Sequence, residues 1–145
     1  MTQIYVDGDA CPVKSEVLRV AERYARKVII VSNGGLRPSR DPMIQHVIVP
    51  KSADAADDWI AEEVTSADIV VTADIPLAKR CLDKGALVID HRGKTFTEEN
   101  IGMAIAMRDL KQELRETGEV QTFNKSFSKA DRSNFLQTLD RLLAR

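Results

Sequence analysis

Short, almost uniformly apolar runs alternate with segments of helical periodicity as far as Asp90. Runs such as Val28-Ile29-Ile30-Val31 are β-branched throughout and lack the polar alternation of a strand that faces water on one side. Strands buried on both faces are typical of parallel sheets, and intervening helices supply the crossovers that parallel pairing needs. The sequence therefore predicts an α/β fold, a parallel sheet in a three-layer α/β/α arrangement. The predicted strands are residues 3–6, 28–31, 46–49, 68–72 and 86–89, and the predicted helices are 12–26, 53–65 and 74–84.

The pattern becomes helical after Asp90, which predicts a helical C-terminal region. Thr97 can cap a helix that runs to about Glu116, and we expect its Met and Leu residues to form a packing stripe. Residues 117–128 lack periodicity and are expected to form a mobile loop. Ser128 and Asp131 form a capping-box pair for a last helix, 129–144. The predicted stripes are Met103, Met107, Leu110 and Leu114 in the first helix, and Phe135, Leu136, Leu139, Leu142 and Leu143 in the last.

Length and charge limit the possible classes of protein. A chain of 145 residues suits one domain, so we expect residues 1–145 to fold as a single unit. The net charge of −1 means that any nucleic-acid binding must depend on a local basic patch. Cys11 and Cys81 are too few for a disulfide framework or a zinc site and are expected to be packed, reduced thiols. Without a leader or a membrane-length apolar segment, we expect a cytoplasmic protein with no membrane association. The sequence does not specify an oligomeric state.

Acidic residues follow several of the predicted strands. Because the carboxyl ends of parallel strands meet at one edge of the sheet, these carboxylates are expected to converge there. They are Asp7 and Asp9 after the first strand, Asp74 after the fourth and Asp90 after the fifth, with Asp54, Asp57 and Asp58 at the start of helix 53–65. Oxygen ligands without His or Cys suit Mg²⁺ or Mn²⁺ better than zinc. The candidate metal ligands are Asp7, Asp9, Asp57, Asp58, Asp74 and Asp90.

Helical rotation separates the two neighbouring acids of helix 53–65. Ile60 and Val64 define its apolar face; Asp57 falls at the margin of that face and Asp58 points away from it. Asp57 is therefore the preferred ligand and Asp58 the second choice. Each acid also has a structural alternative. Acids at a helix start can stabilise the helix through its dipole, Asp74 can be an N-cap, and Asp90 can be a turn residue. A purely structural role explains Asp7 least well, because burying a carboxylate at a strand end costs free energy unless another group compensates its charge.

A metal at this edge could activate water and stabilise charge on a phosphodiester. Such a site also needs groups that bind the substrate's phosphates. The candidates at the same edge are the basic Lys14, Arg37 and Lys79, with Arg40 and Arg80 as further cations, and the polar Ser32, Asn33 and Thr72. For each basic residue, a solvated surface charge is the alternative interpretation.

Three segments carry a family resemblance: Val6-Asp7-Gly8-Asp9-Ala10-Cys11-Pro12-Val13-Lys14, Ala53-Asp54-Ala55-Ala56-Asp57-Asp58-Trp59-Ile60 and Val71-Thr72-Ala73-Asp74-Ile75-Pro76-Leu77-Ala78. The chain resembles the YaiI/YqxD family (UPF0178, DUF188) of bacterial proteins over nearly its whole length, including residues 127–133. The resemblance to that family implies a fold but does not specify an activity.

The same family is similar to the PIN-like nuclease superfamily. PIN domains carry an Asp at the end of the first strand, which Asp7 matches, and an acid on a later helix, usually Glu, where this chain has Asp57 or Asp58. They also carry a Thr-x-Asp, which Thr72-Ala73-Asp74 matches. A further acid commonly follows two residues later, where this chain has Pro76; Asp9 or Asp90 could replace it.

The leading hypothesis is a Mg²⁺- or Mn²⁺-dependent nuclease of PIN-like fold with Asp7, Asp57 and Asp74 as catalytic residues. The resemblance favours RNA over DNA as its substrate. A haloacid-dehalogenase-type phosphatase is an alternative, because Asp7-Gly8-Asp9 fits that family's Asp-x-Asp pair, but the order of the later motifs argues against it. The other alternative is a non-catalytic module that binds a metal, a nucleotide or RNA.

Overall fold

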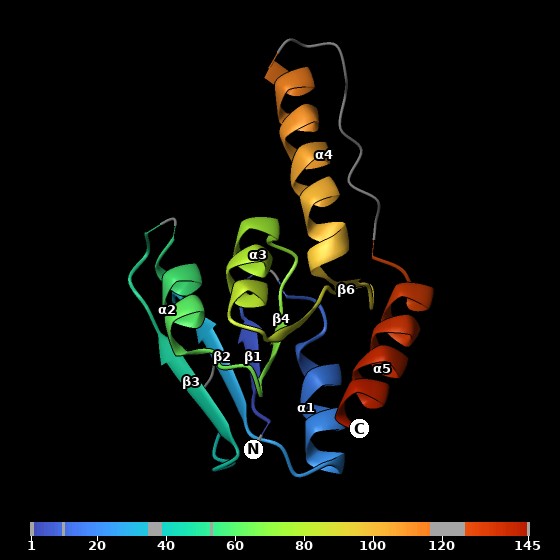
Figure 1. Ribbon diagram of the computed structural model, residues 1–145. Helices are drawn as coiled ribbons and strands as arrows, with labels where there is room; N and C mark the ends of the chain where they lie inside the picture. Colours follow the sequence, from blue (N-terminus) through green and yellow to red (C-terminus); the bar gives the residue numbers. More distant parts are fainter. Residues whose placement is uncertain (1, 10, 35–38, 53, 117–126, 145) are drawn as a thin grey trace.

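A mostly parallel sheet forms the centre of the computed structural model, which describes residues 2–9, 11–34, 39–52, 54–116 and 127–144 (Figure 1). The strands within these ranges are β1 (Ile4–Asp7), β2 (Val28–Ser32), β3 (Ile44–Ile48), β4 (Ile69–Val71), β5 (Leu87–Ile89) and β6 (Thr95–Phe96). Their order in the sheet is β3-β2-β1-β4-β5-β6, and only the β5–β6 pair is antiparallel. The helices are α1 (Lys14–Arg23), α2 (Ala55–Glu63), α3 (Ile75–Asp83), α4 (Glu98–Glu116) and α5 (Lys129–Leu143).

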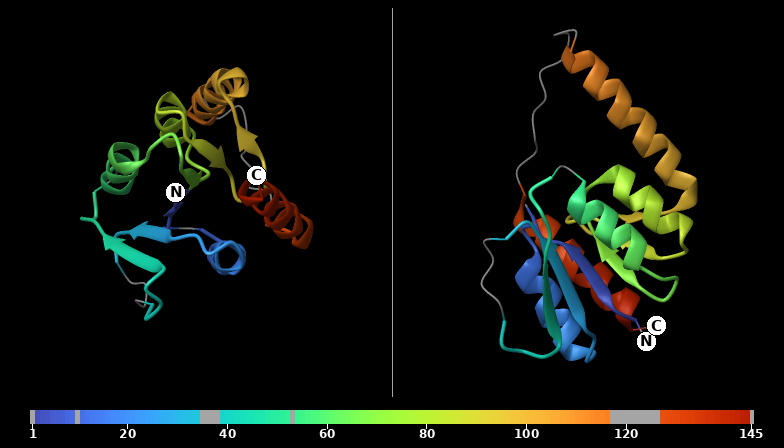
Figure 2. Two further views of the ribbon diagram at one scale, coloured as in Figure 1. Left: turned by 60° about the horizontal axis from the view of Figure 1, so that its bottom comes forward. Right: turned by 90° about the vertical axis from the view of Figure 1, so that its left-hand side faces the viewer.

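Helices cover both faces of the sheet, so the predicted three-layer α/β/α fold is confirmed. Helices α1 and α5 lie on one side, and α2, α3 and the base of α4 lie on the other (Figure 2). Alternate residues of β1 serve the two cores: Ile4 and Val6 pack towards α1 and α5, whereas Tyr5 packs towards α2. Cys11 and Cys81 are free, buried thiols in opposite cores, as expected.

The ends of several elements differ from the prediction. The helix expected over 12–26 is shorter, because the chain leaves the helical conformation before Ala25, which has a left-handed φ of 53°. The helix expected over 53–65 spans Ala55–Glu63 and the strand expected over 46–49 spans Ile44–Ile48. Strand β6 was not predicted, since two residues are too few for a recognisable pattern. Most of the loop expected over 117–128 lies outside the described residues, which resume at Phe127.

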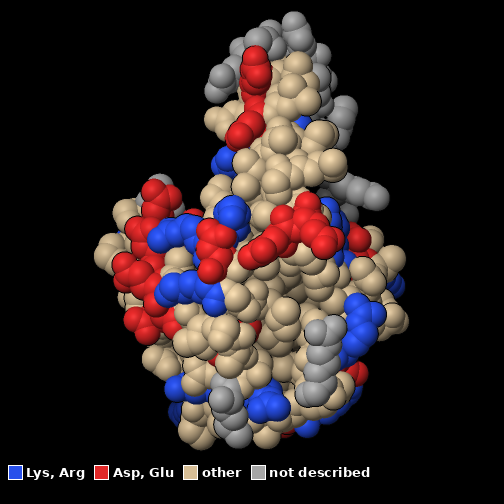
Figure 3. Space-filling model, viewed as in Figure 1, with Lys and Arg blue, Asp and Glu red and all other residues tan. Residues whose placement is uncertain are grey.

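Helix α4 projects from the body, and the prediction of a packed Met and Leu stripe on it is wrong. Met103, Met107 and Leu110 are exposed, with relative accessibilities of 73%, 47% and 46%, and only the fourth member, Leu114, is partly buried. The residues of α4 that pack against the core are instead Ile101, Ala104 and Ile105, from its first half. Acidic side chains are visible along the projecting part of the helix (Figure 3). The helix thus has two apolar stripes, and the body of the molecule covers only one.

Helix α5 closes the face of the sheet that α1 begins. Ser128 and Asp131 form the predicted capping box, and the predicted apolar stripe is buried, apart from Leu136, which is partly buried. The guanidinium of Arg132 hydrogen-bonds to Glu16 of α1 and lies 5.1 Å from the centre of the Phe127 ring. Among the described residues, no helix is long and apolar enough to cross a membrane.

Candidate functional site

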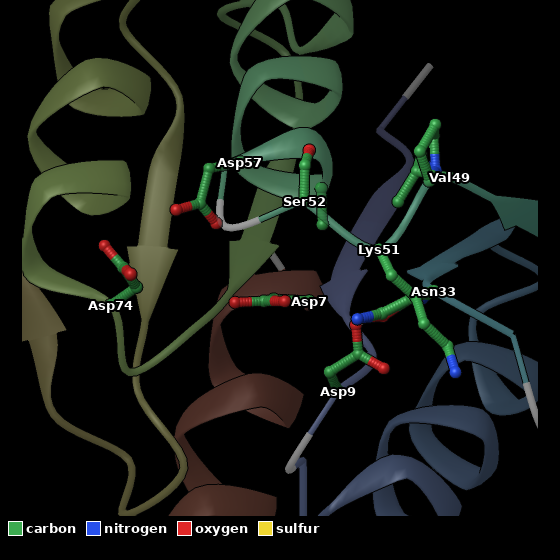
Figure 4. A pocket seen from close by; sticks show the side chains of 10 residues that line it. Asp7, Asp9, Asn33, Val49, Lys51, Ser52, Asp57 and Asp74 are labelled. Atoms are coloured by element: carbon green, nitrogen blue, oxygen red, sulfur yellow. The ribbon is translucent and has the colours of Figure 1, made fainter.

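A pocket of about 420 Å³ opens at the carboxyl edge of the parallel strands. Its lining comes from the ends of β1, β2 and β3 and from the starts of α2 and α3. The lining residues are Asp7, Asp9, Asn33, Val49, Pro50, Lys51, Ser52, Ala56, Asp57 and Asp74. We call this cavity the acidic pocket. Asp7 lies between Asp57 and Asp74 on one side and Asp9 with Asn33 on the other (Figure 4).

Thr72 positions two of the four acids. Its hydroxyl donates to Asp7 Oδ2 at 3.1 Å and accepts a hydrogen bond from the Asp74 backbone N–H at 3.0 Å. Asp74 is also the N-cap of α3, where its Oδ1 accepts from the Leu77 N–H at 2.9 Å. We expected Thr72 to contact substrate, and this is wrong: the side chain is fully buried. Its role is to hold Asp7 and Asp74 beside each other.

Gly8 is required by close packing between β1 and β2. Its N–H donates to the Val31 carbonyl at 2.7 Å, and a Cβ at this position would lie 2.9 Å from that oxygen and 2.8 Å from Ile30 Cγ2. Only glycine lets the chain pass this close and continue to Asp9. The Asp9 carboxylate then accepts from the Asn33 backbone N–H at 3.1 Å, and the Asn33 side-chain amide is placed to donate to it as well. Asp9 thereby ties the ends of β1 and β2 together.

The pocket acids perturb one another electrostatically. Burial, followed by the charges of Asp74, Asp7 and Asp54, raises the pKa of Asp57 from 3.8 to about 7. Burial also raises the pKa of Asp7, and the charges of Asp74 and Asp9 add to this, against the opposing hydrogen bond from Thr72. At neutral pH the pocket therefore holds concentrated negative charge, and Asp57 is protonated in part of the molecules.

None of the ion pairs found in the described part of the chain involves an acid of the pocket. Several carboxylates elsewhere are paired: Asp58 with Arg80 at 2.8 Å, Asp83 with Lys79 at 2.6 Å, Asp131 with Arg92 at 3.3 Å and Asp140 with Arg23 at 3.1 Å. Lys51 is the one basic side chain of the pocket lining. Sequence reasoning missed it, although it follows the third strand at the edge where the other candidates were sought. The four pocket acids thus lie close together without the counter-ions that these carboxylates have.

Two acids proposed as metal ligands lie outside the pocket. Asp58 pairs with Arg80, since it stands one position further around α2 than Asp57. Asp57 is therefore the acid of this pair that the fold turns into the pocket, as helical rotation predicts. Asp90 accepts from the backbone N–H groups of Arg92 and Lys94, both at 2.9 Å, and is thus a turn residue, the alternative considered above.

Most of the proposed phosphate-binding residues also lie elsewhere. Ser32 is buried, and its hydroxyl accepts from the Gly34 N–H at 3.3 Å. Lys79 pairs with Asp83, and Lys14 is partly buried near the start of α1, outside the pocket lining. Arg37 lies outside the described residues. Of the proposed polar contacts, Asn33 alone lines the pocket.

The donor set of the pocket suits a hard divalent cation. Within the described ranges, no three His, Cys, Asp or Glu side chains stand close enough together to hold a metal ion as they are placed. Like charges are expected to stand apart without a cation, and carboxylate oxygens are the ligands that Mg²⁺ and Mn²⁺ prefer. The pocket therefore offers the chemistry of such a site in an open arrangement.

Comparison with known proteins gives a consistent family. A family model described as "Uncharacterized BCR, YaiI/YqxD family" matches residues 5–145. A UPF0178 protein of Mesorhizobium japonicum is 65% identical over 98% of this chain and 92% of its own length. UPF0178 proteins of Agrobacterium fabrum and Rhizobium meliloti are 62% and 61% identical, over 99% and 98% of this chain and 94% and 97% of their own lengths. No solved structure matches the chain.

Proposed function

The chain belongs to the YaiI/YqxD family, and from that premise we propose that its acidic pocket binds Mg²⁺ or Mn²⁺ and hydrolyses phosphodiesters in a nucleic acid, with RNA favoured over DNA as the substrate. One observation carries the proposal. Four carboxylates line a single pocket without an ion pair among the described residues, and burial together with the charges of Asp74 and Asp7 raises the pKa of Asp57 to about 7. A divalent cation would relieve the repulsion among these carboxylates.

Asp7, Asp57 and Asp74 are the residues that would hold the cation, and Asp9 is the fourth acid within the pocket. When bound, such an ion lowers the pKa of a water molecule and neutralises charge on a phosphodiester. Asp57 would release its proton on binding, because metal ligands must be deprotonated. Thr72 fixes the carboxylate of Asp7 and the backbone of Asp74, so the site would need movement chiefly at Asp57.

The pocket supports the comparison with PIN domains at three positions. The acids at Asp7, Asp57 and Asp74 occupy the end of β1, the first turn of α2 and the N-cap of α3. Pro76 stands where PIN domains commonly have a further acid. Of the two proposed replacements, Asp9 lines the pocket and Asp90 does not. Lys51 lines the same cavity and can pair with a phosphate group of a substrate.

Calorimetric titration of Mg²⁺ and Mn²⁺, run beside cleavage of a labelled RNA, tests the proposal. We expect the wild-type protein to bind and cleave, Asp7→Asn to lose both activities, and Asp58→Asn to keep both. The control is matched, since Asp58 is an exposed acid paired with Arg80 outside the pocket. Thermal unfolding of each variant checks that it is folded.

Cleavage that survives in Asp7→Asn would overturn the assignment of the active site. Cation binding by the wild type without turnover of RNA or DNA would reject hydrolysis and leave a metal-binding module. Absence of cation binding would reject the metal site itself.

A further inference from the structure

A second cavity, of about 480 Å³, lies between α4 and the start of α3. Its lining includes Ile75, Lys94, Met103, Met107, Arg108 and Lys111, and we call it the basic groove. Asp74 lines the acidic pocket and Ile75, the next residue, lines the basic groove. Consecutive residues at the start of α3 therefore line the two cavities.

Helix α4 separates its charges between two flanks. With 3.6 residues per turn, Arg108 and Lys111 fall on the flank that lines the groove. The acids Glu99, Asp109 and Glu113 fall on the other flank. The guanidinium of Arg108 also lies 3.8 Å from the Asp109 carboxylate, in an exposed ion pair at the boundary of the two flanks. Lys94, which precedes β6, adds a third cation to the groove. This segregation gives a protein of net charge −1 a local basic surface beside its acidic pocket.

We propose that the basic groove binds a single-stranded nucleic acid, and that it holds the part of the strand adjacent to the phosphodiester in the acidic pocket. The inference rests on the proposed function. Without a bound cation, the four carboxylates of the pocket outnumber Lys51 and repel phosphates, so a strand that reaches it needs further cations nearby. Lys94, Arg108 and Lys111 line the neighbouring cavity.

The exposed methionines favour a single strand over a duplex. Met103 and Met107 have relative accessibilities of 73% and 47%, and their flexible thioethers can pack against apolar surfaces of varied shape. A single strand presents the flat faces of its bases to such side chains, whereas a duplex stacks those faces internally. Phosphates on cations and bases on methionines would then account for both the charged and the apolar lining.

The test is fluorescence anisotropy of a labelled twelve-nucleotide RNA, titrated with protein in EDTA. Removing metal separates binding in the groove from chemistry in the pocket. The groove variant is Lys94→Gln/Arg108→Gln/Lys111→Gln. The matched control, Arg19→Gln/Lys129→Gln/Arg141→Gln, removes three exposed cations from α1 and α5 on the opposite face of the sheet.

We expect the groove variant to bind the RNA at least about tenfold more weakly, and the slope of log affinity against log salt to fall by about 2 for three lost phosphate contacts. The control is expected to bind like the wild type. Single-stranded DNA of the same sequence should bind through the groove too, and a duplex more weakly than either.

Three results would overturn the inference: no RNA binding by the wild type in EDTA, equal losses in the groove variant and the control, or a duplex that binds as tightly as the single strand. Asp7→Asn is expected to retain metal-free binding, since it leaves the groove intact. A protein that binds RNA in EDTA but never cleaves it would contradict the proposed hydrolysis and keep the groove assignment. Cleavage unaffected by the groove variant, with unchanged affinity, would contradict the groove alone.

Discussion

The substitution Asp57→Asn should make the protein more stable at alkaline pH. The carboxyl of Asp57 has a pKa of about 7 in the folded protein, compared with an ordinary value of 3.8. Between these values the folded state binds a proton that the unfolded state does not, so the wild type loses stability as pH rises from about 4 to 7. The asparagine of the variant does not ionise, so Asp57→Asn does not lose stability over this pH range.

The difference between the pKa of Asp57 in the folded and the unfolded protein sets the size of the change in unfolding free energy. A difference of about 3 pH units at about 1.36 kcal/mol per unit gives an upper limit of about 4 kcal/mol above pH 7. The side chain remains partly exposed and shares its repulsion with Asp7 and Asp74, so solvent screening reduces the effect. We therefore expect Asp57→Asn to stabilise the protein by roughly 1–2 kcal/mol at pH 8, with a rise in Tm of roughly 2–8 °C.

Urea and thermal unfolding in EDTA, at pH 8 and pH 4.5, measure the effect without a bound cation. The advantage of Asp57→Asn should shrink at pH 4.5, where the folded wild type keeps its proton. Asp58→Asn is the control: it lies next in sequence and loses only an exposed ion pair with Arg80, so it should gain no stability. Equal stability of Asp57→Asn and wild type at pH 8, or an identical gain at both pH values, would refute the electrostatic account of the pocket.

Further predictions concern the geometry and the ionisation of the site. Thr72→Val should weaken cation affinity about tenfold and lower the unfolding free energy by about 1–3 kcal/mol, whereas Thr72→Ser should keep the affinity; calorimetry and urea unfolding measure both. Gly8→Ala should destabilise the protein by about 1–3 kcal/mol because its Cβ would clash with Val31, while Gly102→Ala, in open space on a helix, should be neutral or stabilising in the same unfolding assay. Cation affinity should rise between pH 6 and 8 with release of a proton from Asp57; calorimetry in two buffers of different ionisation enthalpy would contradict this by showing no proton release.

The central sheet was predictable because its strands are buried on both faces. Such strands leave continuous apolar runs in the sequence, as Val28-Ile29-Ile30-Val31 does, and helical crossovers leave a different period between them. The same geometry predicted that Asp7 and Asp74 would meet at one edge. Rotation about α2 was enough to favour Asp57 over Asp58, because one residue turns a helix by about 100°.

Polar residues at strand ends were harder to place. Ser32 and Thr72 are short hydroxyl residues at the functional edge, and both turn inward to bond with the backbone or with Asp7. In strands that are apolar on both sides, sequence alternation gives no sign of which face a polar residue takes. Lys51 lines the pocket although the segment after β3 has no periodic signal.

The two apolar stripes of α4 show another limit of prediction from sequence. Met103 and Met107 recur at helical spacing, but Ile101 and Ile105 do so on another side of the same helix. Periodicity identifies both stripes equally. Which one packs depends on where the body of the molecule ends, and this is a tertiary property that the local pattern does not contain.

The place of α5 in the fold has a consequence for synthesis on the ribosome. Phe135, Leu139, Leu142 and Leu143 belong to the same buried cluster as Ile4 and Val17, from the start of the chain. The apolar surface of α1 and β1 therefore stays uncovered until residues 129–143 have emerged from the exit tunnel. During that interval the nascent chain exposes a surface of the kind that chaperones bind, and this face of the fold can be completed only after α5 has been synthesised.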